Sequence, residues 1–187
     1  EVSGAIGIVE RLESALKDCF DHDILLDATI AQSQRQKDGL WNLREMTPEA
    51  NKLAGAFCNS DTSVPISKIS NFIEDAYTAI QIIHPNLRIN SYGHIGDGNI
   101  HLNVLPPKEV SKVDFLKDHP KVIEEVRMAI NKTTHSLGGS ISAEHGIGRL
   151  KTKDLEIYAN KARLKTIKSI KSAMHPNNIM NPGVIIS

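Results

Sequence analysis

The stretch SYGHIGDGNIHLNV, residues 91–104, predicts a β-hairpin that brings two histidines together. Its Asp97-Gly98 lies between two alternating apolar runs, which is typical of a two-residue hairpin turn. Such a turn would place His94 directly opposite His101. The Cβ atoms of opposed residues are about 4.5–5.5 Å apart, so both imidazoles could bind the same ion.

The hairpin would present two different faces, because side chains alternate along a strand. Tyr92 and Asn103 would share the face of the two histidines. Ile95, Ile100 and Leu102 would form the opposite face and pack in the core. The histidine face is therefore more polar than a buried sheet requires, which points to a function.

Helical and strand patterns alternate along the rest of the chain. The helical patterns cover residues 8–20, 34–46, 66–84 and 119–137, and two more helical stretches precede a Pro/Asn-rich end. The strand patterns cover the first residues of the chain, 23–31 and 56–65. We expect an α+β fold: a ferredoxin-like antiparallel sheet with helices on one face, plus a C-terminal helical segment.

The composition restricts the classes of partner. The 187 residues include 22 basic and 22 acidic side chains, without long blocks of either sign. Nucleic acid or an anionic membrane surface is therefore not expected as the main partner. No apolar run reaches the roughly 20 residues of a transmembrane helix. Cys19 and Cys58 are expected to be free thiols of a reducing compartment. We expect a cytoplasmic location, with peripheral attachment to an inner membrane as an open alternative.

A second candidate site is Glu144-His145, which small residues and glycines flank in SAEHGIG. A carboxylate beside an imidazole can act as a metal ligand, as a base, or as both. With His94 and His101, Glu144 would give two histidines and one carboxylate, a set that leaves coordination positions open for a substrate. From spacing alone, an ordinary loop pair and two satisfied strand histidines explain these residues equally well.

Two weaker candidates lie elsewhere. LWNLRE contains Arg44, and a guanidinium suits bidentate binding of a carboxylate. The alternative is a solvated arginine on a helix, beside a core Trp41. GHIGDGN lacks the glycine spacing of nucleotide-binding loops, so we reject nucleotide binding there.

Three motifs, GHIGDGNIHLNV, SAEHGIGRLK and PNNIMNPGVI, resemble in order and spacing the C-terminal domain of the FAD-linked oxidases. That family includes D-lactate dehydrogenase, D-2-hydroxyglutarate dehydrogenase and the glycolate oxidase FAD subunit. EVSG, LWNLRE and DTSVP also fall where the family has comparable segments, so the resemblance covers essentially the whole chain. It implies that residues 1–187 form a substrate-binding cap domain whose N-terminal FAD-binding domain is absent from this chain. The opening EVSGAIG has no polar lead-in, which also favours the C-terminal part of a longer protein.

The resemblance implies a metal site and a base. His94, His101 and Glu144 would hold a divalent ion, commonly zinc. His145 would act as the base on a 2-hydroxy acid, whose hydride would pass to FAD.

The resemblance also implies contacts with substrate and cofactor. Arg44 would bind a substrate carboxylate, Asn103 would contact the substrate, and Asn181 would lie by the flavin domain. One position departs from the family, whose members often have a substrate-binding lysine two residues before the Asp of the SDTSVP segment. This chain has Asn59 there. The departure favours a monocarboxylate, lactate-like or glycolate-like, over 2-hydroxyglutarate.

These observations lead us to expect part of an FAD-dependent enzyme that oxidises a D-2-hydroxy acid to the 2-oxo acid. Its partners would be the small substrate and the flavin domain of the same protein, with a homodimer left open. The alternative is a non-catalytic metal-binding or dimerisation module that retains the fold. His145 favours the enzyme, because metal storage does not need a base beside the ligands.

Overall fold

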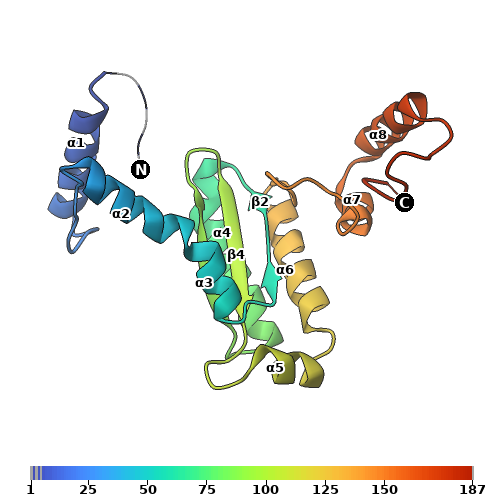
Figure 1. Cartoon of the computed structure of the whole chain (residues 1–187), viewed down its shortest axis with the longest axis horizontal. Helices are drawn as coiled ribbons and strands as arrows, with labels where there is room; N and C mark the ends of the chain where they lie inside the picture. The colour runs from blue at the N-terminus through green and yellow to red at the C-terminus, as the bar shows by residue number, and fades with distance from the viewer. Residues whose placement is uncertain (1, 3, 5, 187) are drawn as a thin grey trace. The chain divides into compact units, whose positions relative to one another are not determined.

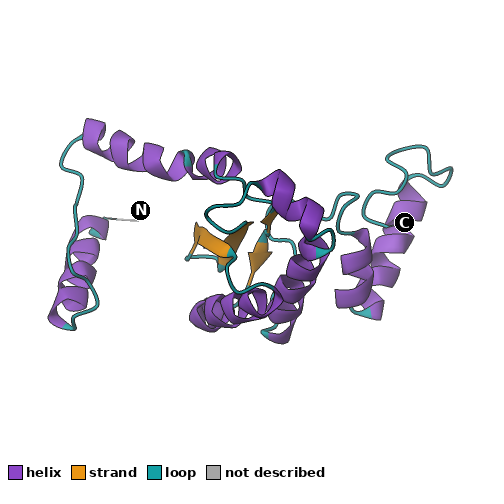
Figure 2. Cartoon of the chain, turned by 90° about the horizontal axis from the view of Figure 1, so that it is seen from below, coloured by secondary structure: helices purple, strands orange, loops and turns teal. Residues whose placement is uncertain are grey.

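The computed structural model describes residues 2, 4 and 6–186 of the chain. The chain forms two compact units, residues 1–47 and 48–187. Helices make up much more of it than strands do (Figure 2). None of the described helices is long and apolar enough to span a lipid bilayer.

The described part of the N-terminal unit contains α1 (Ile8–Asp21) and α2 (Gln34–Glu45), both of which the sequence predicted (Figure 1). The Ser33 hydroxyl accepts a hydrogen bond from the Gln36 N–H at 3.3 Å and caps α2. The prediction of a strand over 23–31 was wrong, because no described segment pairs with these residues. The expected opening strand falls partly on residues 1, 3 and 5, outside the described residues.

The C-terminal unit consists of a small sheet with helices around it. Its first helix is α3 (Thr47–Leu53), with Pro48 in the first turn. The elements that follow are β1 (Cys58–Asn59), β2 (Thr62–Ser63), the 3₁₀ helix η1 (Ile66–Lys68), α4 (Ile69–Ile83), β3 (Arg88–His94), β4 (Asn99–Leu105), α5 (Lys112–Asp118), α6 (Val122–Ser136), α7 (Thr152–Tyr158) and α8 (Lys161–Met174).

The central strand of the sheet is β4, which pairs antiparallel with β3 on one side and with β1 and β2 on the other. β1 and β2 follow one register: Cys58 lies opposite Val104, and Thr62 lies opposite Ile100. They are therefore two parts of one strand, the β1–β2 line, which is interrupted at Ser60 and Asp61. An isolated antiparallel β-bridge between Ser63 and Ser140 extends the sheet beyond β2. The order β-α-β-β-α-β, with α4 and α6 as its helices, confirms the predicted α+β, ferredoxin-like arrangement.

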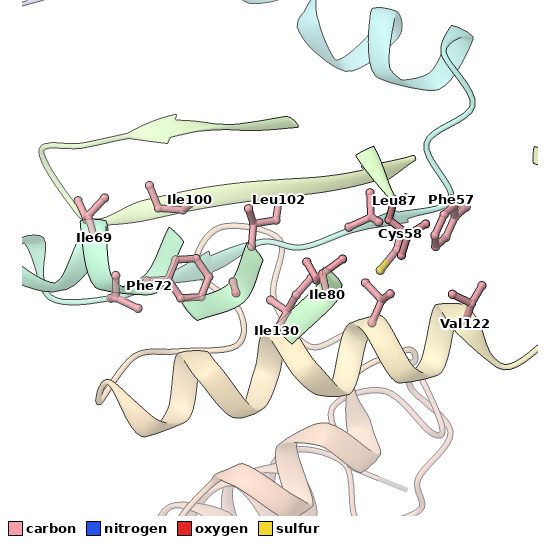
Figure 3. Packing of buried hydrophobic residues seen from close by; sticks show 14 of the residues in the cluster. Phe57, Cys58, Ile69, Phe72, Ile80, Leu87, Ile100, Leu102, Val122 and Ile130 are labelled. Carbon is pink, nitrogen blue, oxygen red and sulfur yellow. The ribbon is translucent and has the colours of Figure 1, made fainter. Parts of the chain in front are cut away.

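The hydrophobic core lies between one face of the sheet and the helices α4 and α6 (Figure 3). Phe72 and Ile80 of α4 meet Leu102 of β4 and Ile130 of α6 there, and all four side chains are buried. The helix predicted over residues 66–84 forms in large part as α4, and its buried apolar residues pack in this core. Ile66 is an exception and is mostly exposed, because it belongs to the 3₁₀ turn before α4.

The hairpin forms, but with a longer loop than predicted. His94 pairs with Asn99 instead of His101, so residues 95–98 make a four-residue loop. The Asp97 N–H donates to the His94 carbonyl, and the Asp97 carboxylate accepts the Asn99 N–H at 3.0 Å. Ile95 consequently lies in the loop, 73% exposed, and its predicted place in the core was wrong. Both histidines keep the same face, because the register changed by an even number of residues.

Candidate metal and substrate site

Three potential ligand groups converge at one end of the sheet. The Nε2 atom of His94 lies 3.5 Å from Oε1 of Glu144, and Nε2 of His101 lies 3.9 Å from Oε2. One ligand atom from each of the three residues lies within 4.8 Å of the other two. The sequence predicted this set, and the structure brings its members together from β3, β4 and the segment between α6 and α7.

The ring of His101 has a defined orientation. Its Nδ1 atom lies 3.3 Å from the Ser60 carbonyl oxygen, which can only accept a hydrogen bond. Nδ1 is therefore the donor in this contact, and Nε2 is the ring nitrogen that faces Glu144. The Ser60 carbonyl is available because the Leu102 N–H donates to the Ser60 hydroxyl instead.

The Glu144-His145 segment is held by a carboxylate from a distant part of the chain. Asp61 lies in the interruption between β1 and β2, and its side chain is 4% exposed. It accepts hydrogen bonds from three consecutive backbone N–H groups, those of Ala143 at 3.2 Å, Glu144 at 3.1 Å and His145 at 2.8 Å. The contact thus joins Asp61 to the backbone of both Glu144 and His145.

The charge of Asp61 is compensated. Burial raises the pKa of its carboxyl, but the N–H groups of His145 and Glu144 and the nearby Lys151 outweigh burial, so the pKa lies below its ordinary value. Lys151 Nζ lies 3.9 Å from Asp61 Oδ2 and donates to the Ile141 carbonyl at 2.9 Å. Burial lowers the pKa of Lys151, although Asp61 and Asp154 oppose this shift.

His145 lies beside the ligand cluster and is open to solvent. Its side chain is 68% exposed, and its Nδ1 lies 4.0 Å from Oδ2 of Asp61. The ring stacks on His101 with centroids 5.9 Å apart. His145 therefore borders the cluster of His94, His101 and Glu144 and is accessible from solvent.

The predicted substrate residue Asn103 lies on the histidine face, but it is buried. Its side-chain amide donates to the Asn90 carbonyl at 3.5 Å, and the Asn90 amide donates to Asn51 of α3 at 2.8 Å. Asn59 is directly opposite Asn103 in the β1–β4 pairing. Its neighbour Cys58 points into the core, so Asn59 shares the polar face.

Two other predicted residues lie elsewhere in the chain. Arg44 belongs to the N-terminal unit, where its guanidinium carbon is 5.9 Å from the ring centre of Trp41. Trp41 is 40% exposed, so it is not the core residue considered from sequence. Asn181 lies in the tail after α8 in a left-handed conformation, and its carbonyl accepts the Val184 N–H.

Ser60 and Asp61 were not predicted from the sequence as parts of this site. A signal was present, because Ser and Asp interrupt a strand pattern in CNSDTSV and Asp is disfavoured in strands. The partners of Asp61 are 82 to 84 residues away, so no local pattern relates them.

In sequence, the chain is similar to several D-2-hydroxyglutarate dehydrogenases. The D-2-hydroxyglutarate dehydrogenase of Stutzerimonas stutzeri is 35% identical over 181 residues, which are 95% of this chain and 38% of that protein. The enzyme of the same name from Xanthomonas citri is 34% identical over 170 residues, 91% of this chain and 35% of the relative. The mitochondrial D-2-hydroxyglutarate dehydrogenase of Arabidopsis thaliana is 31% identical over 95% of this chain and 30% of its own length.

The chain thus spans less than two fifths of the length of these relatives. A family model described as the C-terminal domain of FAD-linked oxidases matches residues 1–185. Since the match covers nearly every residue, the chain belongs to the family of FAD-linked oxidase C-terminal domains.

Proposed function

We propose that this chain is the substrate- and metal-binding part of an FAD-dependent dehydrogenase that oxidises a D-2-hydroxy acid to the 2-oxo acid. The observation that carries the proposal is the convergence of His94, His101 and Glu144 within 4.8 Å, with His145 next to them. Membership of the FAD-linked oxidase family supports it. The flavin would be bound by another domain of the same protein and would accept the hydride.

The donor set fits a divalent ion, and zinc is the one we expect. Imidazole nitrogens and a carboxylate oxygen suit zinc, and catalytic zinc sites have three protein ligands and an open position. Because Nδ1 of His101 contacts the Ser60 carbonyl, His101 would bind the metal through Nε2, with that carbonyl as the outer partner. A bound divalent ion would lower the pKa of the substrate hydroxyl and orient the substrate carboxylate.

His145 would take the proton of the 2-hydroxyl group. A histidine side chain can accept a proton near neutral pH. The backbone N–H of His145 donates to Asp61 at 2.8 Å, while the side chain is 68% exposed. The backbone of the base would therefore be held in place, and its imidazole ring would be accessible to substrate. Arg44 would bind the substrate carboxylate, and its substitution by alanine should mainly raise KM.

The length of the hydroxy acid is a finer part of the proposal. Asn59 occupies the polar face, where a lysine would provide a cation for a second carboxylate, and this favours a lactate-like or glycolate-like substrate. The names of the relatives favour D-2-hydroxyglutarate as the second candidate. A well-formed hydrogen bond to a charged group contributes about 1.5–3 kcal/mol. The exposure of Asn59 reduces this value through solvent screening, but a single position can still change the preference between the two substrates.

The test uses the full-length protein that contains this chain. Purified enzyme should contain about one divalent ion per chain by elemental analysis and should reduce a dye acceptor with at least one D-2-hydroxy acid of a panel. Chelation should abolish turnover, and zinc should restore it. His94→Ala should lose both metal and turnover.

A matched control is His22→Ala, which removes an exposed histidine of the N-terminal unit and should change neither property. Metal binding without turnover on any D-2-hydroxy acid would favour the non-catalytic module. Turnover that survives complete metal removal would contradict the role of the ion.

A further inference from the structure

The interruption of the β1–β2 line is a structural feature that the proposed reaction does not itself explain. The flanking pairs keep one register with β4, so no residue is inserted in the partner strand. Nevertheless the ladder is irregular at Ser60 and Asp61, where the Leu102 N–H binds a side-chain hydroxyl rather than a carbonyl. An uninterrupted strand would keep the regular backbone hydrogen bonds at this position. Asp is also disfavoured in strands.

Burial of the Asp61 carboxylate is the second unusual feature. The whole residue is 3% exposed, and isolated buried charges are strongly unfavourable unless they are paired and hydrogen-bonded. Here the carboxylate accepts three consecutive N–H groups and lies beside Lys151. The N–H groups contribute most of the direct hydrogen bonds, since the Lys151 ammonium lies 3.9 Å away.

The segment that Asp61 binds has little regular structure of its own. It runs from the bridge at Ser140 to the start of α7, and Gly146 and Gly148 both have positive φ angles. Glycines in this region leave the backbone several accessible conformations. A side chain that accepts the N–H groups of residues 143–145 therefore selects one conformation, the one in which Glu144 faces the two histidines.

We propose that Asp61 is a positioning residue, whose carboxylate fixes the backbone of Glu144 and His145 and so preorganises both the metal ligand and the base. The inference rests on the proposed function, because it assigns Asp61 to the same site. It adds a residue that touches neither the ion nor the substrate. Partners of this kind typically change metal affinity or activity by about 10–100-fold.

The test compares Asp61→Asn with Asp154→Asn in the full-length enzyme. Asp154 is a matched control: it is also buried and lies 3.6 Å from a cation, Arg127, but it belongs to α7 and does not bind residues 143–145. Zinc affinity is measured by competition with a chelator of known affinity, and kcat and KM are measured in zinc-saturated enzyme. Asp61→Asn should bind zinc about 10–100-fold more weakly and should retain a reduced kcat at saturating zinc. Asp154→Asn should keep the zinc affinity within about twofold, whatever its thermal stability.

Equal losses of zinc affinity in both variants, or an unchanged affinity in Asp61→Asn, would overturn the inference. If Asp61→Asn does not fold, amide hydrogen exchange of the wild-type protein tests the role of Asp61 instead. The amide hydrogens of Glu144 and His145 should exchange slowly even in the metal-free protein, in contrast to that of Gly96 in the exposed hairpin loop. Fast exchange at 144 and 145 would overturn the role of Asp61.

Failure of the proposed function is recognised separately, in the wild-type enzyme. Absence of metal binding or of hydroxy-acid oxidation there would contradict both proposals. A wild-type enzyme that binds zinc and turns over, together with an unaffected Asp61→Asn variant, would contradict only the positioning role.

Discussion

The two faces of β4 are buried to similar degrees but have opposite chemistry. Ile100, Leu102 and Val104 face α4 and α6, and each is at most 6% exposed. Asn99, His101 and Asn103 face the other way and are at most 9% exposed. The first face has the composition of an ordinary core, whereas the second buries two amides and an imidazole within the same seven residues.

The apolar face of β4 thus contributes mainly to stability, whereas the polar face carries the residues of the proposed site. Both polar atoms of the Asn99 side-chain amide have no hydrogen-bond partner among the described residues. An unsatisfied buried polar group costs about 1–3 kcal/mol, so Asn99 makes an unfavourable contribution to folding. The apolar face must offset that cost. Substitutions on the two faces should therefore affect different measurable properties.

The largest effect is expected on the polar side, at His145. In the full-length enzyme, His145→Ala should lower kcat by about two to four orders of magnitude, the range for a positioned general base. The free energy of unfolding should hardly change, because the side chain is 68% exposed. Metal content, measured by elemental analysis, should also remain the same. Loss of the metal in this variant would instead identify His145 as a ligand.

On the apolar side, Leu102→Ala should destabilise the domain by about 2–5 kcal/mol, since it leaves a cavity at a fully buried position. Urea denaturation followed by circular dichroism measures the change. Ile82→Ala is the matched control: Ile82 is 80% exposed on α4, and its loss should cost less than about 0.5 kcal/mol. A Leu102→Ala protein as stable as the control would contradict the division between the faces.

The apolar face was predictable from sequence because its signal is local. Alternation over residues 99–105 and helical spacing over 66–84 and 119–137 are properties of neighbouring residues. Residues 23–31 have a strand pattern too, but they form no strand, and Ile24 and Leu26 are mostly or fully exposed. A strand pattern predicts a strand only if another segment is available to pair with it.

The polar face was predictable only in part. The sharing of one face by His94 and His101 survived the error in register, because that error was an even number of residues. The four-residue loop itself depends on Gly98, whose backbone approaches Val64 so closely that an added Cβ would clash with the Val64 carbonyl oxygen. That contact, like the one between Asp61 and Glu144, joins segments distant in sequence. Local patterns contain no information about such contacts.

Cys58 offers a smaller test of the apolar side, based on pH. Burial raises the pKa of the Cys58 thiol from 9.0 to about 11, although the charge of Arg127 opposes the shift. A raised pKa keeps the thiol protonated, so at pH 8 the reactive thiolate should be about 100-fold less populated than at the unshifted pKa. Alkylation followed by mass spectrometry should find Cys58 at least 100-fold slower in native than in urea-unfolded protein, with the native rate rising toward pH 11. Equal rates in both states would contradict its place in the core.

The smallest expected effect concerns the substrate and returns to the polar side. Asn59 pairs with Asn103 across β1 and β4, on the face of the histidines. Asn59→Lys would add a cation there without altering a core position, since Cys58 and not Asn59 contributes to the core. A charged hydrogen bond to a second carboxylate contributes about 1.5–3 kcal/mol when well formed. The exposure of Asn59 reduces this value through solvent screening.

We therefore expect Asn59→Lys to raise the ratio of kcat/KM for D-2-hydroxyglutarate to that for D-lactate by about tenfold, or about 1.4 kcal/mol. The change should come mainly from KM for the dicarboxylate, because the added cation would bind the distal carboxylate and not the reacting carbon. Ser136→Lys, which adds the same charge at the exposed end of α6, should leave the ratio unchanged. If the wild-type enzyme already prefers D-2-hydroxyglutarate and Asn59→Lys does not alter the ratio, another cation binds the second carboxylate. The polar face of β4 would then not determine the length of the substrate.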